Sequence, residues 1–242
     1  LNLKTLLKVF KVVINEALTL GSDTNFGYDY LKDFEQRFEI KARGPVSTGW
    51  PDIDDLCKQG LGKGELGVVV APTGAGKSMA LVHLGAAALK AGKTVIHYTL
   101  ELADTVVATR YDSCLTGIPL DKLHAFKEQI YEELQELEGS LIVKEYPTGI
   151  AHVGHFRALL NDLKLKKGFM PDIIYVDYLN ICASSRMKGL GGAINSYSLV
   201  KAIAEEVRGL AVEFNVPIWS ATQTNRDGFD NSDADLTNVA ES

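Results

Sequence analysis

From about residue 44 onward, short continuous runs of apolar residues alternate with longer segments in which apolar residues recur at helical spacing. Strands that are apolar at every position are typical of a parallel sheet covered on both faces. The expected strands are Leu66–Ala71, Thr94–Thr99, Leu141–Glu145, Ile173–Asp177 and Ile218–Ala221. The expected helices are Lys77–Lys90, Leu102–Thr116, Asp121–Glu138, Val153–Lys167 and Ser196–Phe214. This alternation predicts an α/β fold with a mostly parallel central sheet covered by helices.

The first 43 residues follow a different pattern. Apolar residues recur every three or four positions between Leu3 and Leu18, which predicts an amphipathic helix. Such a helix either packs on its own domain or docks on a neighbouring subunit, and the sequence leaves both open. A second short helix is predicted from the spacing of Leu31, Phe34 and Phe38. We therefore expect a helical linker over residues 1–43 and one larger domain over residues 44–242.

Composition narrows the class of protein. The chain has 242 residues, 46% hydrophobic and 23% charged, which suits one large α/β domain, with two small domains as the weaker alternative. The three cysteines stand far apart, so a disulfide framework or zinc site is unexpected and a reducing cytoplasm is favoured. Lysines interrupt the apolar N-terminal stretch, so we expect no membrane span.

The net charge of −6 excludes a histone-like or generally basic nucleic-acid binder. It leaves room for a local basic groove, because electrostatic steering depends on where the charges sit.

The first expected strand leads into Ala71-Pro72-Thr73-Gly74-Ala75-Gly76-Lys77-Ser78, a Walker A phosphate-binding loop with alanine at its first glycine position. The glycines let backbone N–H groups curl around phosphate oxygens, and the following helix N-terminus adds positive potential. Lys77 would contact the β- and γ-phosphates of ATP, and the Ser78 hydroxyl would ligate Mg²⁺. The alternative, an ordinary glycine turn, leaves the coincidence of strand, Gly-Lys-Ser and helix unexplained.

Two carboxylates are placed to complete such a site. Asp177 ends an apolar strand, where a Walker B carboxylate would hold Mg²⁺ at the ligand-binding edge of the sheet. Glu101 follows the strand Thr94–Thr99 and would reach the same edge, as the candidate that activates the attacking water. The alternatives are a cap or loop role for Asp177 and a solvated surface position for Glu101.

Taken in order, these motifs resemble the RecA-like motor domain of DnaB-type replicative helicases, most of all those of tailed phages. The segments that carry the resemblance are Thr99-Leu100-Glu101-Leu102 followed by Arg110, Asp177-Tyr178-Leu179, and Thr222-Gln223-Thr224-Asn225-Arg226. The resemblance covers roughly residues 44–242. It implies a RecA-like P-loop NTPase that couples ATP hydrolysis to translocation on single-stranded DNA and duplex unwinding.

The resemblance also implies residue roles. Glu101 matches the family's catalytic glutamate, and Gln223 matches a glutamine that senses the γ-phosphate and couples hydrolysis to DNA-loop movement. Arg110 matches an arginine of the family and is assigned to the nucleotide site, with a helix-surface position as the alternative. Arg186, Lys188 and Arg226 lie in segments that match the DNA-contacting loops, where cations would contact successive phosphates.

The same family implies a homo-hexameric ring, a primase or helicase loader as partner, and a cytoplasmic setting in a bacterial or phage-infected cell. Segments matching its N-terminal domain and its final strands are absent from the sequence. We expect the residues that are present to bind nucleotide, whereas motor action and ring assembly would also need those segments.

Two other classes share this core. A RecA- or RadA-like recombination or repair ATPase would form filaments or lack processive unwinding, and a non-helicase nucleotide-binding switch would not bind single-stranded DNA. The Thr-Leu-Glu strand end with Arg110 and the segment around Gln223 favour the helicase.

Overall fold

The computed structural model describes residues 27–35, 38, 43–186 and 196–224 of the chain. The chain divides into two compact units, Leu1–Ala42 and Arg43–Ser242. In the first unit, residues 30–34 form turns, and the Asp29 carboxylate accepts hydrogen bonds from the N–H groups of Leu31 and Lys32 at 3.2 and 3.1 Å. This side chain favours a turn where apolar spacing alone predicted a short helix. The helix expected between Leu3 and Leu18 lies outside the described residues.

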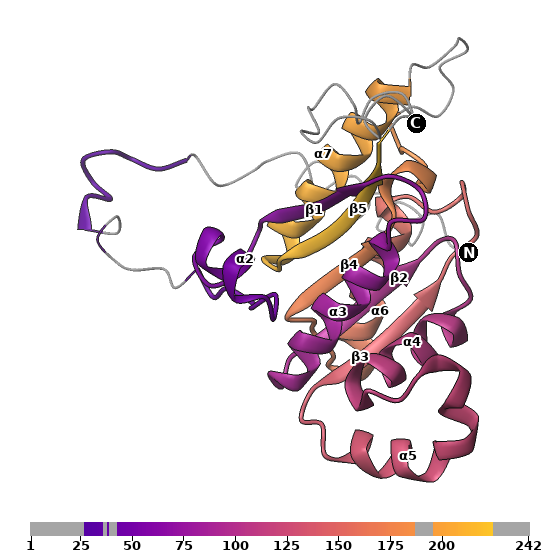
Figure 1. Ribbon diagram of the computed structural model, residues 1–242. Coiled ribbons are helices and arrows are strands. Elements are labelled where there is room, and N and C mark those ends of the chain that lie inside the picture. Colours follow the sequence, from indigo (N-terminus) through magenta and orange to yellow (C-terminus); the bar gives the residue numbers. More distant parts are fainter. Residues whose placement is uncertain (1–26, 36–37, 39–42, 187–195, 225–242) are drawn as a thin grey trace, which may run out of the picture. The chain divides into compact units, whose positions relative to one another are not determined.

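The second unit is built on a five-stranded sheet (Figure 1). Its strands are β1 Leu66–Ala71, β2 Thr94–Thr99, β3 Ser140–Glu145, β4 Ile173–Asp177 and β5 Ile218–Gln223. Every pairing between these strands is parallel, and their spatial order is β1-β5-β4-β2-β3. The predicted α/β fold with a parallel central sheet is therefore confirmed.

Successive residues of the central strands pack on opposite faces of the sheet. On β2, Ile96 and Tyr98 belong to one buried cluster and Val95 belongs to the other. The first cluster joins the sheet to α6 (Val153–Lys167) and α7 (Ser196–Phe214), and the second joins it to α3 (Lys77–Lys90) and α4 (Asp104–Thr116). Because helices cover both faces, neither set of alternating positions needs polar residues, which explains the continuous apolar runs.

The predicted bounds of α3, α6 and α7 agree with the structure, and two other helices differ. Helix α4 begins at Asp104, not Leu102, because the Thr99 hydroxyl donates to the Leu102 carbonyl at 2.8 Å and accepts its N–H at 3.2 Å, which holds a turn. The single helix expected over residues 121–138 is a 3-10 helix, η2 (Leu120–Phe126), followed by α5 (Lys127–Gln135). The backbone of Phe126, at φ −117° and ψ 26°, interrupts the helix between them.

Two short elements were not predicted, α2 (Pro51–Leu56) and η3 (Leu179–Ile181). In the described part of the chain, no helix combines the length and the apolar character needed to cross a lipid bilayer.

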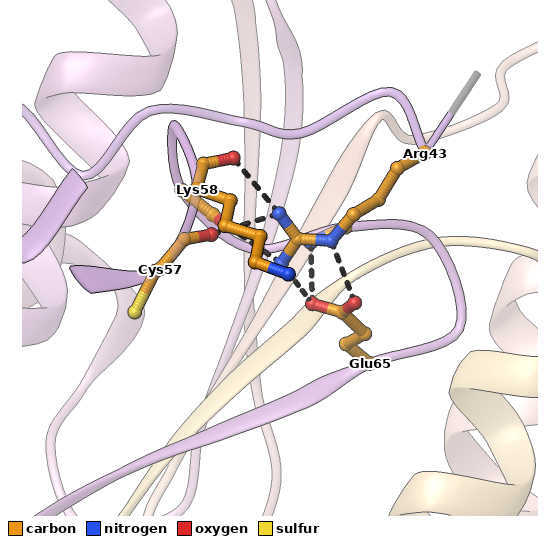
Figure 2. A network of polar contacts seen from close by, with 6 residues as sticks. Arg43, Cys57, Lys58 and Glu65 are labelled. Carbon is orange, nitrogen blue, oxygen red and sulfur yellow. Dashed lines mark hydrogen bonds and ion pairs between the residues drawn. The ribbon is translucent and has the colours of Figure 1, made fainter. Parts of the chain in front are cut away.

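The start of the second unit is fastened to the base of β1 by Arg43 (Figure 2). Its guanidinium donates to both carboxylate oxygens of Glu65, at 2.7 and 2.5 Å, and to the carbonyls of Cys57, Lys58 and Gly60, at 2.8 to 2.9 Å. The guanidinium thus makes five hydrogen bonds, as many as it has N–H groups. A Cβ added to Gly62 would lie 2.4 Å from the Arg43 side chain, so the loop is shaped around this guanidinium.

We expect Arg43→Met to lower the free energy of unfolding by about 2 kcal/mol. The substitution removes the donor to three carbonyls and leaves the half-buried Glu65 carboxylate with the Gly62 N–H, at 2.8 Å, in place of the guanidinium. Arg43 lowers the pKa of Glu65. The stability contributed by the pair of Arg43 and Glu65 is therefore complete at pH values above the ordinary glutamate pKa. It is lost as the pH falls through the lower pKa that Glu65 has in the folded state. Urea denaturation at pH 7 and at acidic pH measures this, with the exposed Lys63→Met as the matched control. Equal losses in free energy of unfolding for the two variants would show that the hydrogen bonds of Arg43 do not stabilise the fold.

Candidate active site

The carboxyl ends of four strands bring the predicted site residues to one edge of the sheet. Ala71 at the end of β1 lies opposite Gln223 of β5, and Thr99 at the end of β2 lies opposite Asp177 of β4. The Leu100 N–H donates to the Asp177 carbonyl at 3.0 Å, which carries the pairing past the end of β2 toward Glu101. In an open parallel sheet, this edge is where ligands bind.

The loop between β1 and α3 is shaped as a phosphate cradle. Gly74 and Gly76 have φ values of +79° and +94°, a left-handed conformation that favours glycine. An added Cβ at either position would meet no heavy atom within 4 Å, so open space lies beside both residues. Gly76 is also the N-cap of α3, which places the positive end of a 14-residue helix at the loop. The loop therefore fits a bound polyphosphate.

Lys77 begins α3 and is half-buried in this loop. Its ammonium group donates to the carbonyls of Ala71 and Pro72 at 3.2 and 3.0 Å, and it lies 5.7 Å from the centre of the Tyr178 ring. Burial lowers the pKa of Lys77, and the charges of Asp177 and Glu101 oppose that shift. Weak carbonyl partners hold this cation in place, and an anionic ligand would bind it more strongly.

Asp177 is the most deeply buried charged group of the site, at 1% exposure. Burial raises its pKa, partly offset by the nearby Ser78 hydroxyl and by the charges of Arg110 and Lys77. Neither of its carboxylate oxygens has a hydrogen-bond partner within the described ranges. A buried carboxylate with free oxygens beside Ser78 is suited to hold a hydrated divalent cation, so the residues present fit Mg²⁺.

A cavity of about 230 Å³ brings together most of the predicted residues. Its lining is Thr73, Gly74, Gly76, Lys77, Ser78, Met79, Glu101, Arg110, Tyr178 and Gln223. Glu101 is exposed on this lining, as a water-activating carboxylate needs to be. Arg110 projects from α4 into the same cavity and also lines a second cavity of about 690 Å³ between α4, η2 and α5. Its predicted contact with the nucleotide stays a prediction.

Gln223 links the end of β5 to the phosphate-binding loop. Its side-chain amide donates to the Thr73 hydroxyl, and its backbone N–H donates to Oδ1 of Asn180 at 3.2 Å. The same oxygen accepts from the Thr222 hydroxyl at 2.8 Å. Sequence reasoning missed Asn180 and Tyr178 as site residues. Both closely follow Asp177 in the sequence, and that closeness was the signal that could have identified them.

Of the three predicted DNA-contacting residues, the structure describes Arg186. Arg186 forms an ion pair with Glu205, at 2.7 Å, and lines a cavity that shares no residue with the one at Lys77. Lys188 and Arg226 lie outside the described residues.

The fold and the site together define a P-loop domain with a RecA-like sheet. The chain belongs to the DnaB-like helicase C-terminal domain family, whose model matches residues 45–237. It is 39% identical over 242 residues to a DnaB-like replicative helicase of enterobacteria phage T4, which covers 95% of this chain and 50% of the phage protein. The resemblance to DnaB-type helicases, including the link to phages, is thereby confirmed.

Two solved structures share the fold. One is of a DnaB-like replicative helicase studied with its interactions with primase, at a TM-score of 0.69 and 15% identity, over 99% of this chain and 60% of that one. The other is of an ATPase domain, at a TM-score of 0.68 and 16% identity, over 89% of this chain and 79% of that one. The predicted RecA-like fold is therefore confirmed. The chain spans about half the length of its phage T4 relative.

Proposed function

We propose that this domain is the ATP- and Mg²⁺-dependent motor of a replicative DNA helicase, which couples hydrolysis to translocation on single-stranded DNA and duplex unwinding. The observation that carries the proposal is the meeting of Lys77, Glu101 and Gln223 on one cavity beside the unpartnered, buried Asp177 carboxylate. Membership of the DnaB-like helicase family supports the DNA-directed part.

Each residue has a distinct task in this proposal. Thr73, Gly74, Ala75 and Gly76 wrap backbone N–H groups around the phosphates, and Lys77 neutralises charge on the β- and γ-phosphates. Ser78 and Asp177 would hold Mg²⁺, which supplies further charge neutralisation between those phosphates. Glu101 orients the attacking water and accepts its proton. Arg110, which lines the same cavity, is a second cation for the phosphates.

Gln223 is the proposed coupling residue. Its amide already bridges β5 and the phosphate-binding loop through Thr73. A change at the γ-phosphate would alter that bridge and so displace the segment that follows β5. That segment contains Arg226, which we propose as a DNA contact together with Arg186 and Lys188.

Assembly and partners complete the proposal. We infer a homo-hexameric ring with hydrolysis at subunit interfaces, a primase or helicase loader as partner, and a cytoplasmic location. A ring needs basic residues only along its inner lining, so the net charge of −6 is compatible with DNA binding.

The decisive experiment measures ATP hydrolysis by the purified protein with and without single-stranded DNA, together with unwinding of a forked duplex. We expect DNA to stimulate hydrolysis and unwinding to require ATP and Mg²⁺. A rate of ATP hydrolysis that is the same with and without DNA would indicate a nucleotide-binding switch instead. Helical filaments on DNA in electron micrographs would indicate a recombinase.

A further inference from the structure

One carboxylate holds the backbone that leads from β4 into the proposed DNA-contacting segment. Glu206 of α7 accepts hydrogen bonds from the Ser184 hydroxyl at 2.6 Å, the Ser185 N–H and hydroxyl at 3.2 and 2.9 Å, and the Arg186 N–H at 3.3 Å. Glu206 and Ser184 are 8% and 4% exposed. The three residues before the undescribed segment are thus fastened to one point of a long helix.

Glu206 is ionised at neutral pH. Its burial acts to raise its pKa, but the donors from Ser184, Ser185 and Arg186 outweigh burial and lower the pKa below its ordinary value. Burying an ionised carboxylate costs free energy unless its oxygens accept hydrogen bonds. The backbone conformation that supplies these donors is therefore favoured over others.

The preceding residue holds Arg186 in a different way. Glu205 pairs with the Arg186 guanidinium at 2.7 Å, where the two side chains are 51% and 57% exposed. An exposed ion pair of this kind contributes only about 0 to 1 kcal/mol and weakens with salt. Glu206 therefore fixes Ser184 and Ser185 directly, and the Arg186 N–H is shared between Glu206 and the Ser184 hydroxyl, at 3.3 and 3.2 Å. Glu205 holds only the exposed guanidinium of Arg186.

Arg186 also lines a groove beside this ion pair. It has a volume of about 320 Å³ and is lined by both glutamates, Arg186, Arg157, Gly209 and Glu213, among others. Across it, Arg157 donates to Glu213 at 2.8 to 2.9 Å in a second exposed pair. A Cβ on Gly209 would meet no heavy atom within 4 Å, so open space lies beside this lining residue.

We propose that Glu206 is a positioning residue that presents Arg186 to a backbone phosphate of single-stranded DNA, and that Glu205 is the competitor this phosphate displaces. The inference rests on the proposed function. It predicts that neutralising two adjacent glutamates changes DNA affinity in opposite directions. Loss of Glu206 removes the presentation of the cation, whereas loss of Glu205 removes its intramolecular partner.

The test compares Glu206→Gln, Glu205→Gln, Arg186→Ala and the double variant Glu206→Gln with Arg186→Ala. The readouts are the Kd for a labelled oligothymidylate by fluorescence anisotropy at several salt concentrations, DNA-independent ATP hydrolysis, and the thermal midpoint. We expect Glu206→Gln to weaken binding about fivefold and Glu205→Gln to tighten it about threefold, within the coupling range of contacting residues. DNA-independent hydrolysis should be unchanged in both.

Two further signatures separate positioning from general support. The slope of log Kd against log salt reports the number of phosphates that the protein contacts. Arg186→Ala should reduce this slope by the amount that corresponds to about one phosphate, and Glu206→Gln should reproduce part of that reduction. In the Arg186→Ala background, Glu206→Gln should have no additional effect on Kd.

Several results would overturn the inference. Additive losses in the double variant, or parallel falls in thermal midpoint and basal hydrolysis, would make Glu206 a general structural anchor. Unchanged or weaker DNA binding by Glu205→Gln would contradict the role of Glu205 as a competitor for Arg186. If Glu206→Gln does not fold, the Kd of Glu205→Gln alone tests the inference. If the wild-type protein binds no single-stranded DNA, the proposed function fails as well. If it binds and neither glutamate variant alters Kd, only this inference fails.

Discussion

Replacement of Lys77 by alanine is expected to reduce ATP hydrolysis at least about 100-fold. In the proposed reaction, this ammonium group neutralises charge on the phosphoryl group being transferred, and no other lysine lines the 230 Å³ cavity as described. The rate is measured by phosphate release at saturating ATP and Mg²⁺, and the affinity by binding of a fluorescent ATP analogue. Both should fall, because the lysine contacts the ground state as well as the transition state.

The matched control is Lys90→Ala at the other end of the same helix, where the side chain is exposed. It removes an equal charge without touching the cradle, so hydrolysis should stay near the wild-type rate. Lys77→Ala should also remain folded, because it gives up hydrogen bonds to only two carbonyls, those of Ala71 and Pro72. Substantial hydrolysis by folded Lys77→Ala would mean that the phosphates bind elsewhere.

Glu101→Gln is expected to reduce turnover about 100-fold or more while leaving ATP binding nearly intact. The amide keeps the size of the side chain but cannot accept a proton from water. Since Glu101 contacts no phosphate in the proposed reaction, it acts on the chemical step and not on ground-state affinity. Single-turnover hydrolysis, measured beside nucleotide binding, separates the two effects.

The neighbouring strand offers a close control. Glu145 ends β3 as the register partner of Thr99, is also exposed, and does not line the nucleotide cavity. Glu145→Gln makes the same chemical change one strand away, and turnover should be nearly unchanged. DNA-stimulated hydrolysis by Glu101→Gln at the wild-type rate would exclude Glu101 as the water-activating group.

Much of the fold was predictable because its signals are local. The central strands are short and mostly apolar, and the change to polar or glycine-containing sequence marks their ends, so the predicted bounds of β1, β2 and β4 match the structure. The helix over residues 121–138 was predicted in one piece because its spacing is continuous. The break at Phe126 depends on how η2 and α5 pack against α4, which spacing along the chain does not encode.

The site shows the same division. The cradle of Gly74, Gly76 and Lys77 could be predicted because its residues are consecutive and their chemistry depends on the strand and helix that flank them. Glu101 and Asp177 were predicted from their places at strand ends and from the resemblance to DnaB-type helicases. Their approach depends on β2 and β4 being neighbours in the sheet, although β3 and several helices lie between them in sequence.

The order of residues along the chain was therefore sufficient to predict the strands, the phosphate-binding loop and a site for nucleotide binding and hydrolysis. Partners that are distant in sequence required the folded chain: Arg43 with Glu65, Gln223 with Thr73, and Glu206 with the backbone of Arg186. The physical reason is that an apolar period reports which face a residue buries, whereas a hydrogen bond between distant side chains depends on which elements come to lie side by side.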